Sequence, residues 1–427
     1  MAGWGAQMTQ RVLGSLQVAA LLVSASYGIG FLFGSGELAI RHGMAGSVYG
    51  VATALGMLVL ALFAKKLWTA GVPVWDLFGQ AYGQRIQRVV ALLSLVWMAG
   101  VLAAQIQGGV AVVRLLGLSG PFGWVVVLGL IYAASRLDLR IVSGVFAMCL
   151  LASGLVLAYA LWAADGMDRY VHAVPAFVRD LVTFSPMRLA AMSLAVSILV
   201  CTGADYHQFV LAARRPSAAI VGCILAGLGL ILIGFLPPTV VVAMSRAGAL
   251  DGLADAKQAV PFLLARMAGS IGPGIDKLML VALSAAALGS GAAILRAMSS
   301  ALASALPGQR RASHPALATV ALAIGASVAA REQGIVETMV SVNVIYIASI
   351  AVTFAALLRG AVMPSAQAGA VMAAGFSLSF AAYLAGWAGW LTDGADVISL
   401  GGGLGASAVA YLVWPGSGLI GVSGSRR

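Results

Sequence analysis

The chain has 427 residues, of which 61% are hydrophobic and only 9% are charged. A soluble domain carries roughly 25% charged residues, so this composition excludes an ordinary soluble protein and indicates a helical membrane protein. The net charge of +11 would suggest nucleic-acid binding in a soluble protein. Here the basic residues lie mostly in loops between apolar runs, so we expect membrane lipid and no nucleic acid as a partner.

Apolar runs long enough to cross a hydrocarbon core of about 30 Å recur along the whole chain. We predict an all-α polytopic membrane protein with about twelve transmembrane helices and a single transmembrane domain over residues 1–427. No cleaved signal peptide is expected. The expected spans are residues 12–40, 44–64, 88–116, 121–135, 140–163, 188–212, 217–244, 276–302, 315–330, 335–358, 365–390 and 397–414.

The basic residues also predict the orientation of the spans. Paired basic residues fall on one side of the membrane if the spans alternate, at 65–66, 214–215, 310–311 and 426–427. The positive-inside rule therefore places both termini in the cytoplasm of a cell membrane, with the bacterial inner membrane as the expected location. The three cysteines and four histidines show no disulfide or metal-ligand spacing.

Two spans are interrupted by glycines next to ionisable residues. The first contains SYGIGFLFGSGE at residues 26–37, and the sixth contains CTGADYHQ at residues 201–208. Each interior glycine costs about 1 kcal/mol relative to alanine, so the first cluster disfavours a continuous helix. The alternative interpretation is that Gly30 and Gly34 permit close helix packing.

Five spans separate the two interruptions, and an odd number of crossings reverses the orientation of the chain. Residues 12–163 and 188–360 are therefore predicted to be inverted five-helix repeats, each beginning with a discontinuous helix. Residues 361–427 would add two further spans. This is the LeuT-type arrangement, in which the broken helices meet near the bilayer midplane and form the binding site.

Four segments resemble the sodium:solute symporter family of the amino acid–polyamine–organocation superfamily. They are GSGELAIRHGMAGSVYGVATALGMLVLALF (34–63), VPVWDLFGQAYGQRIQRVVALLSLV (72–96), AAQIQGG (103–109) and GADYHQFVLAAR (203–214). The resemblance implies a divergent member that lacks the extra N-terminal span of the family. It also implies a secondary transporter for a small solute, and a sodium ion as the coupled ion.

By this resemblance, a sodium ion would be held by Ser290 and by carbonyl groups at Ala286, Ser24 and Tyr27. In the family, the eighth core helix, which here carries Ala286 and Ser290, has another hydroxyl residue next to the position of Ser290, and also an aspartate. Gly289 and Ala292 occupy these positions in GSGAAILRAMSS (289–300). The predicted sodium site is therefore incomplete, and the coupling ion is expected to be either sodium or a proton. An uncoupled protein is the remaining alternative.

The solute is expected to contact the two interruptions and the polar side chains that face them. Gln105 and Gln107 lie about 200° apart on a helix, so only one can face the centre, and we prefer Gln105. Hydroxyl groups on the sixth span often bond their own backbone instead. The predicted substrate-binding residues are Tyr27, Gly28, Gly30, Phe31, Gln105, Ser197, Thr202 and Asn343.

Ionisable residues inside a membrane are costly and point to function by default. Glu37 is expected either to pair with Arg41 four residues later or to contact a cationic solute. Asp205, His207 and Gln208 are expected to form a structural hydrogen-bond network, with direct proton or substrate handling as the alternative.

The leading function is a secondary active transporter for a small polar organic solute, working by alternating access. One four-helix unit (spans 1, 2, 6 and 7) would rock against a scaffold (spans 3, 4, 8 and 9). A transporter-like sensor or an uncoupled facilitator is the alternative. A membrane enzyme that uses Asp205 and His207 is less favoured, because residues two positions apart point to different faces of a helix.

Overall fold

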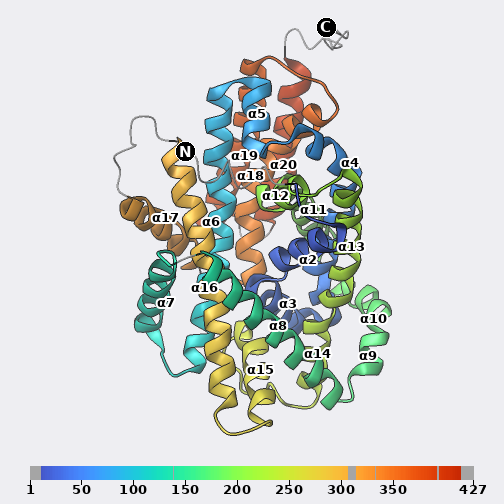
Figure 1. The fold of residues 1–427 in the computed structure, drawn as a ribbon, viewed down its shortest axis with the longest axis vertical. Helices are drawn as coiled ribbons and strands as arrows, with labels where there is room; N and C mark the ends of the chain where they lie inside the picture. Colours follow the sequence, from blue (N-terminus) through green and yellow to red (C-terminus); the bar gives the residue numbers. More distant parts are fainter. Residues whose placement is uncertain (1–10, 138, 306–313, 332, 392–393, 415–427) are drawn as a thin grey trace.

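The structure is a computed structural model that describes residues 11–137, 139–305, 314–331, 333–391 and 394–414 (Figure 1). These residues are almost entirely helical, with one isolated bridge between Leu13 and Ala213. The predicted all-α fold class is confirmed. The twelve predicted spans coincide with α2 (Ser15–Ser26) plus α3 (Ile29–His42), α4 (Val48–Ala70), α6 (Gln84–Leu115), α7 (Gly120–Ala134), α8 (Leu139–Ala163), α11 (Pro186–Thr202) plus α12 (Ala204–Leu211), α13 (Pro216–Gly234) plus α14 (Leu236–Arg246), α16 (Ile275–Ala305), α17 (His314–Ala329), α18 (Ile335–Leu358), α19 (Ser365–Trp387) and α20 (Ala395–Val413).

By length and hydropathy, seven helical segments of the described chain can each cross a membrane, and the bent pair α11–α12 would make an eighth. One of the seven, Ile29–Ala70, joins the end of the first predicted span to the second. Helices α2, α7 and α17 are shorter apolar helices of 10–17 residues, and Leu151–Ala163 of α8 is an apolar stretch of the same kind. Short helices α5 (Val74–Tyr82), α9 (Met167–Val171), α10 (Ala173–Asp180) and α15 (Ala259–Gly269) lie in the connections.

Local sequence signals explain where several helices begin and end. Before α11, the Ser185 hydroxyl accepts a hydrogen bond from the backbone N–H of Arg188, and Pro186 occupies the first helical position. Both choices suit a helix N-terminus, where the backbone N–H groups have no intrahelical partner. The end of α4 is capped by Gly71, whose positive φ of 70° is accessible to glycine at little cost.

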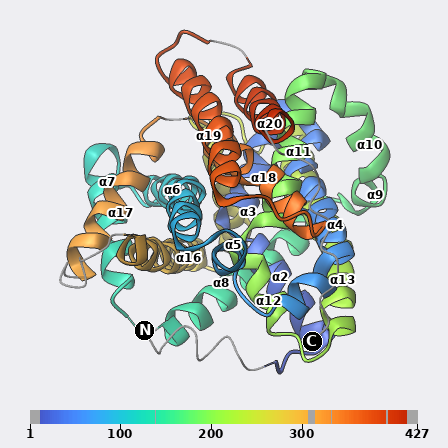
Figure 2. The same ribbon diagram turned by 90° about the horizontal axis from the view of Figure 1, so that it is seen from above.

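The helices sort into two groups that pack mainly within themselves. Helices α2, α4, α11 and α13 pack on one another, whereas α6, α7, α8, α16 and α17 form the other group. Figure 2 shows these groups on opposite sides of the bundle, with α3 and α18 near its middle. Apart from α8, which is the fifth span, and α3, which is half of the first span, the grouping agrees with the division into spans 1, 2, 6 and 7 and spans 3, 4, 8 and 9 that the sequence predicts.

Close helix approach depends on glycines in α3. A Cβ atom on Gly34 would lie 2.6 Å from Cγ2 of Val336, and one on Gly36 would lie 2.2 Å from Cγ2 of Val260. These glycines, and Gly30, lie inside a continuous helix. The prediction that the whole glycine cluster interrupts the first span is therefore wrong in detail, because only Gly28 lies at the break.

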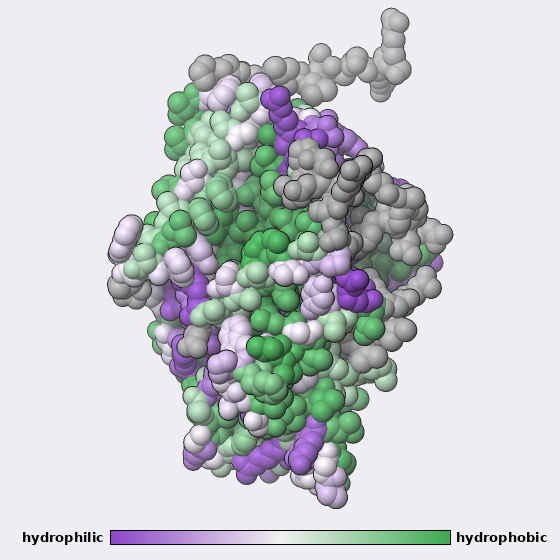
Figure 3. Space-filling view, turned by 90° about the vertical axis from the view of Figure 1, so that its left-hand side faces the viewer, coloured by the Kyte–Doolittle hydropathy of each residue, from purple (hydrophilic) through white to green (hydrophobic). Residues whose placement is uncertain are grey.

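One face of the molecule shows the surface expected of a membrane protein. In Figure 3 apolar side chains cover much of the middle of the face, and strongly hydrophilic side chains lie near its lower and upper ends and in smaller groups at its sides. Exposed apolar side chains such as Leu62, at 83% exposure, need a hydrocarbon solvent rather than water. The basic pairs at 310–311 and 426–427, and both chain termini, lie outside the described residues.

We expect Gly36→Ala to destabilise the protein by about 1–3 kcal/mol, because the stiff Val260 side chain cannot move away cheaply. Gly405→Ala is the matched control, since a Cβ at this position in α20 meets nothing within 4 Å. Thermal unfolding in detergent would measure both variants. Equal unfolding temperatures for the two would contradict the tight packing of α3.

Candidate functional site

The first span is broken at Tyr27 and Gly28. Helix α2 ends at Ser26 and α3 begins at Ile29, with Gly28 in an extended conformation (φ −87°, ψ −179°). The Tyr27 side chain is 9% exposed, and its hydroxyl group has no hydrogen-bond partner among the described residues. The break therefore places a buried polar group and non-helical backbone inside the bundle.

The sixth span is broken at Gly203, where α11 and α12 meet at an angle of 43°. Gly203 has an extended conformation (φ −72°, ψ 125°), so the helical ladder is interrupted on both sides of it. Backbone carbonyl groups freed at membrane depth must find other partners. Both predicted discontinuities are thus present, which confirms the discontinuous first and sixth helices.

Side chains satisfy the carbonyl groups at this second break. Nε2 of His207 lies 2.8 Å from the carbonyl oxygen of Cys201, and the Tyr346 hydroxyl donates to the carbonyl of Thr202 at 3.0 Å. The His207 ring also stacks on Phe354. His207 therefore contacts the interrupted backbone at the second break.

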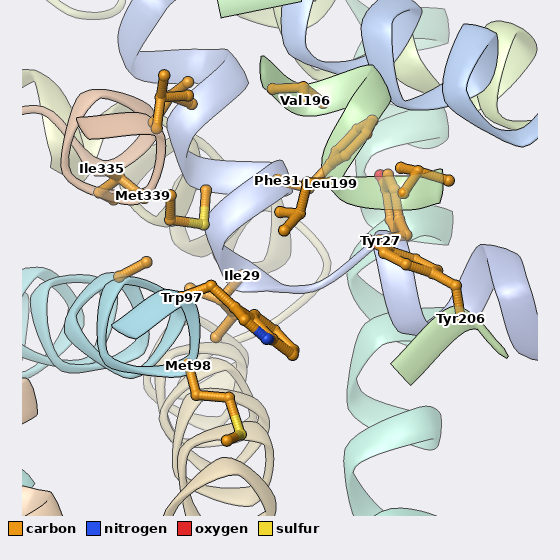
Figure 4. Packing of buried hydrophobic residues seen from close by; sticks show 14 of the residues in the cluster. Tyr27, Ile29, Phe31, Trp97, Met98, Val196, Leu199, Tyr206, Ile335 and Met339 are labelled. Atoms are coloured by element: carbon orange, nitrogen blue, oxygen red, sulfur yellow. The ribbon is translucent and has the colours of Figure 1, made fainter. Parts of the chain in front are cut away.

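The two breaks lie side by side. Helix α12 packs on α2, so the chain directly after the second break lies against the helix that ends at the first. Figure 4 shows Tyr27 next to Tyr206, and Phe31 next to Leu199 of α11. The interrupted backbones therefore share one region of the bundle.

Several buried polar atoms around this region have no hydrogen-bond partner in the described chain. Gln105 faces the first break, since its Nε2 lies 3.8 Å from a Cβ built on Gly28. Asn343 lies against α6, the helix of Gln105, because its Oδ1 is 3.5 Å from the position that a Cβ on Gly100 would take. The atoms without a partner include Oε1 of Gln105, Oδ1 of Asn343, Nε1 of Trp97, Oδ1 of Asp205 and the Tyr27 hydroxyl.

Gln107 points elsewhere. Its Nε2 donates to Thr338 Oγ1 at 3.2 Å and to the Ala329 carbonyl at 3.1 Å. Its amide nitrogen thus joins α6 to α17 and α18.

Other predicted substrate-binding residues are engaged in helix packing. The Ser197 hydroxyl donates to the Ala52 carbonyl of α4 at 2.9 Å, and the Thr202 hydroxyl donates to the Ile198 carbonyl of its own helix. The Phe31 ring lies against Tyr27 and Tyr49, with centroid distances of 5.2 and 5.7 Å. Gly30 faces Met339 of α18.

Glu37 lies at the end of α3, against the start of α18. Its Oε2 accepts a hydrogen bond from the backbone N–H of Ile335 at 2.8 Å, and the residue is 5% exposed. No ion pair with Arg41 is found among the described residues, so the expected i,i+4 pair is wrong. The reason is that the backbone N–H of Ile335, at the N-terminus of α18, has no intrahelical partner and donates to Glu37 instead.

This end of the bundle is closed by further contacts. An ion pair joins Arg188 of α11 to Glu337 of α18. A small pocket between α3 and α18 is lined by Glu37, Leu38, Arg41, Gly334, Val336 and Glu337.

Asp205 and His207 do not form an acid–base pair. His207 is turned to the Cys201 carbonyl, whereas Asp205 Oδ1 has no hydrogen-bond partner. Gln208 is half-buried on the same helical face as Asp205. The predicted polar network is therefore only partly formed, with Asp205 outside it.

The residues expected at the sodium site lie on helices that have few contacts with each other. Ser24 and Tyr27 belong to α2 and its end, which packs mainly on α13 and α12. Ala286 and Ser290 belong to α16, which packs mainly on α6, α8 and α15. Between Ser284 and Ala292 of α16, the side-chain hydroxyls are those of Ser284 and Ser290. The Oγ of Ser284 has no hydrogen-bond partner in the described chain.

Apart from Tyr27 and Phe31, the aromatic residues of the region were not singled out from the sequence. The ring centroids of Trp97 in α6 and Tyr346 are 6.3 Å apart, and the Tyr49 ring packs on Phe31. Tyr206 lies next to Tyr27 (Figure 4). Aromatic side chains in apolar helices look like ordinary core residues, so the sequence carried no signal for them. The exception is Tyr346, which follows the polar positions Thr338, Ser341 and Asn343 on one span.

No protein-family model and no curated relative matches the sequence. Solved structures share its fold. A Na+-coupled sialic acid symporter in a substrate-bound outward-open state has a TM-score of 0.59 and 15% identity, over 93% of this chain and 96% of that chain. A nucleobase-cation-symport-1 family transporter in a closed conformation with bromovinylhydantoin bound has a TM-score of 0.54 and 14% identity, over 95% of each chain.

The manganese transporter of Eremococcus coleocola has a TM-score of 0.56 and 13% identity, over 96% of each chain. At these identities the likeness establishes the fold alone. The chain has the LeuT-type transporter fold, as the sequence predicts.

We expect Tyr346→Phe to destabilise the protein by about 1–3 kcal/mol, because the buried Thr202 carbonyl loses its hydroxyl donor. Tyr159→Phe is the control, since Tyr159 is 40% exposed. The temperature of unfolding of each purified variant measures the difference. A shift no larger for Tyr346→Phe than for Tyr159→Phe would show that the break does not depend on this hydrogen bond.

Proposed function

We propose that the protein is a secondary active transporter that moves a small polar organic solute across the membrane by alternating access. The observation that carries this proposal is the position of the two helix breaks, side by side and surrounded by buried polar atoms that lack partners. Buried polar groups are normally hydrogen-bonded, so unpaired groups at membrane depth favour a ligand or ordered water.

The solute site would lie around Tyr27, Gly28, Gln105 and Asn343. These residues combine hydroxyl and amide groups with non-helical backbone, which suits a polar uncharged or zwitterionic molecule. Ser197, Thr202, Gly30 and Phe31 would shape the wall of the site, because their contacts are with neighbouring helices.

Alternating access would move the group of α2, α4, α11 and α13 against the group of α6, α7, α16 and α17. Residues 12–163 and 188–360 would be the two inverted repeats that produce this motion. With both termini in the cytoplasm, the end of α3 faces outward. The Glu37–Ile335 hydrogen bond and the Arg188–Glu337 ion pair would then hold the outer side closed.

The coupling ion would be sodium or a proton. The sialic acid symporter of similar fold is described as Na+-coupled. In this chain, Gly289 and Ala292 remove oxygen ligands at the corresponding level, which weakens the case for sodium and also leaves room for an uncoupled facilitator or a sensor.

The transport proposal is tested with purified protein in liposomes loaded with a panel of unlabelled metabolites. We expect labelled counterparts of at least one metabolite class to exchange across the membrane, at a rate that falls in Gln105→Leu. Thermal-shift screening with and without sodium, and at two pH values, would choose the panel. Binding without exchange would favour the sensor, and neither binding nor exchange across a broad panel would contradict the proposal.

Sodium coupling is tested separately through Ser290→Ala. If Ser290 is a sodium ligand, this variant should require a higher sodium concentration for half-maximal uptake, while Ser300→Ala, at an exposed position on the same helix, should not. The measurement is uptake of the identified solute against sodium concentration. Uptake that is indifferent both to sodium and to Ser290→Ala would remove sodium from the mechanism.

A further inference from the structure

Asp205 is a carboxylate in the first turn of α12, directly after the break at Gly203. Its Oδ1 is buried and has no hydrogen-bond partner, and no ion pair of the described residues includes it. Backbone N–H groups of Asp205 and Tyr206, at the start of α12, approach the carboxylate, but no group of the described chain replaces the lost hydration of Oδ1. An ionised carboxylate in this state is therefore costly. The basic residues nearest in the chain, Arg214 and Arg215, follow the opposite end of the helix.

The groups around Asp205 come from every helix that packs on α12. They are uncharged near neutral pH or are already engaged: Tyr346 donates to the Thr202 carbonyl, and His207 bonds the Cys201 carbonyl. The titratable side chains that face this region are Tyr49 of α4, Cys201 of α11, Tyr206 and His207 of α12, Cys223 of α13 and Tyr346 of α18.

Asp205 thus lacks a resident cation, and a cation that comes and goes would complete the site. A sodium ion needs several oxygen ligands, and among the described residues no group of three or more Asp, Glu, His or Cys side chains that could hold a metal ion is found. A proton needs only the one free oxygen. Gln208 is half-buried and lies one turn further along the same face of α12, so a polar side chain lies between the carboxyl group and the end of the helix.

We propose that Asp205 is the proton-binding group of this transporter. Its carboxylate takes a proton from water when the site is open to one side and returns it to water on the other side. Each cycle moves one positive charge with the solute. The inference rests on the proposed transport function, but protonation of Asp205 can be measured without any solute.

The first test is infrared difference spectroscopy of the reconstituted protein between about pH 5 and about pH 8, a range that leaves exposed carboxylates ionised. We expect a protonated-carboxyl carbonyl band that shifts when aspartate is labelled with carbon-13 and is lost in Asp205→Asn. Asp168→Asn is the control, because its side chain is 87% exposed. The isotope shift assigns the band to an aspartate, and its loss in Asp205→Asn, together with a shift to the glutamate position in Asp205→Glu, assigns it to residue 205.

The second test uses liposomes and the solute identified by exchange. Asp205→Asn should keep solute exchange but lose accumulation driven by a pH gradient, while Asp205→Glu should restore part of it. No aspartate band in the unchanged protein, or a pH dependence unaltered in Asp205→Asn, would overturn the proton site while leaving transport intact. Absence of exchange in the unchanged protein would instead contradict the transport proposal, whatever the infrared result.

Discussion

Every peptide group at membrane depth needs a hydrogen-bond partner, and this constraint governs the two broken helices. A continuous helix meets it internally, but a break leaves carbonyl groups that other parts of the chain must satisfy. At the second break, α12 itself and α18 supply His207 and Tyr346 for two successive carbonyls. The break is therefore a built feature, because the side chains that stabilise it are in place.

The same requirement explains how α3 is held. Helix α18 begins at the level where α3 ends, and its first N–H groups have no intrahelical partner. Glu37 accepts a hydrogen bond from the N–H of Ile335, so its carboxylate interacts with a helix N-terminus rather than forming an ion pair with Arg41. Gly34 and Gly36 let α3 approach α18 and α15 closely, which buries the carboxylate. The close packing at Gly34 and Gly36 buries the Glu37 carboxylate, and the hydrogen bond from Ile335 compensates that burial.

The presence of a break in the first and in the sixth span could be predicted from the sequence, because glycines in an apolar run that also carries ionisable residues are a local signal. The role of each glycine could not. Gly28 and Gly36 look alike in sequence, and only the presence of Val260 next to Gly36 separates a packing glycine from one at a break. The partner of Glu37 lies 298 residues away in the chain, and no local pattern points to it. The aromatic residues of the site are similarly hidden among core residues.

The two ends of the site differ in how well they are sealed. On the α3 side, residues 29–39 are all buried, and Glu37 and Glu337 have partners. On the α12 side, Asp205 and Gln208 are half-buried, and one carboxylate oxygen has no partner. A transporter closed on one side needs its contacts to be complete there, whereas an exchangeable ion needs a place where they are incomplete. The carboxylates at the two ends therefore differ, because Glu37 and Glu337 have partners and Asp205 has an oxygen without one, as the proposed closed side and the proposed proton site require.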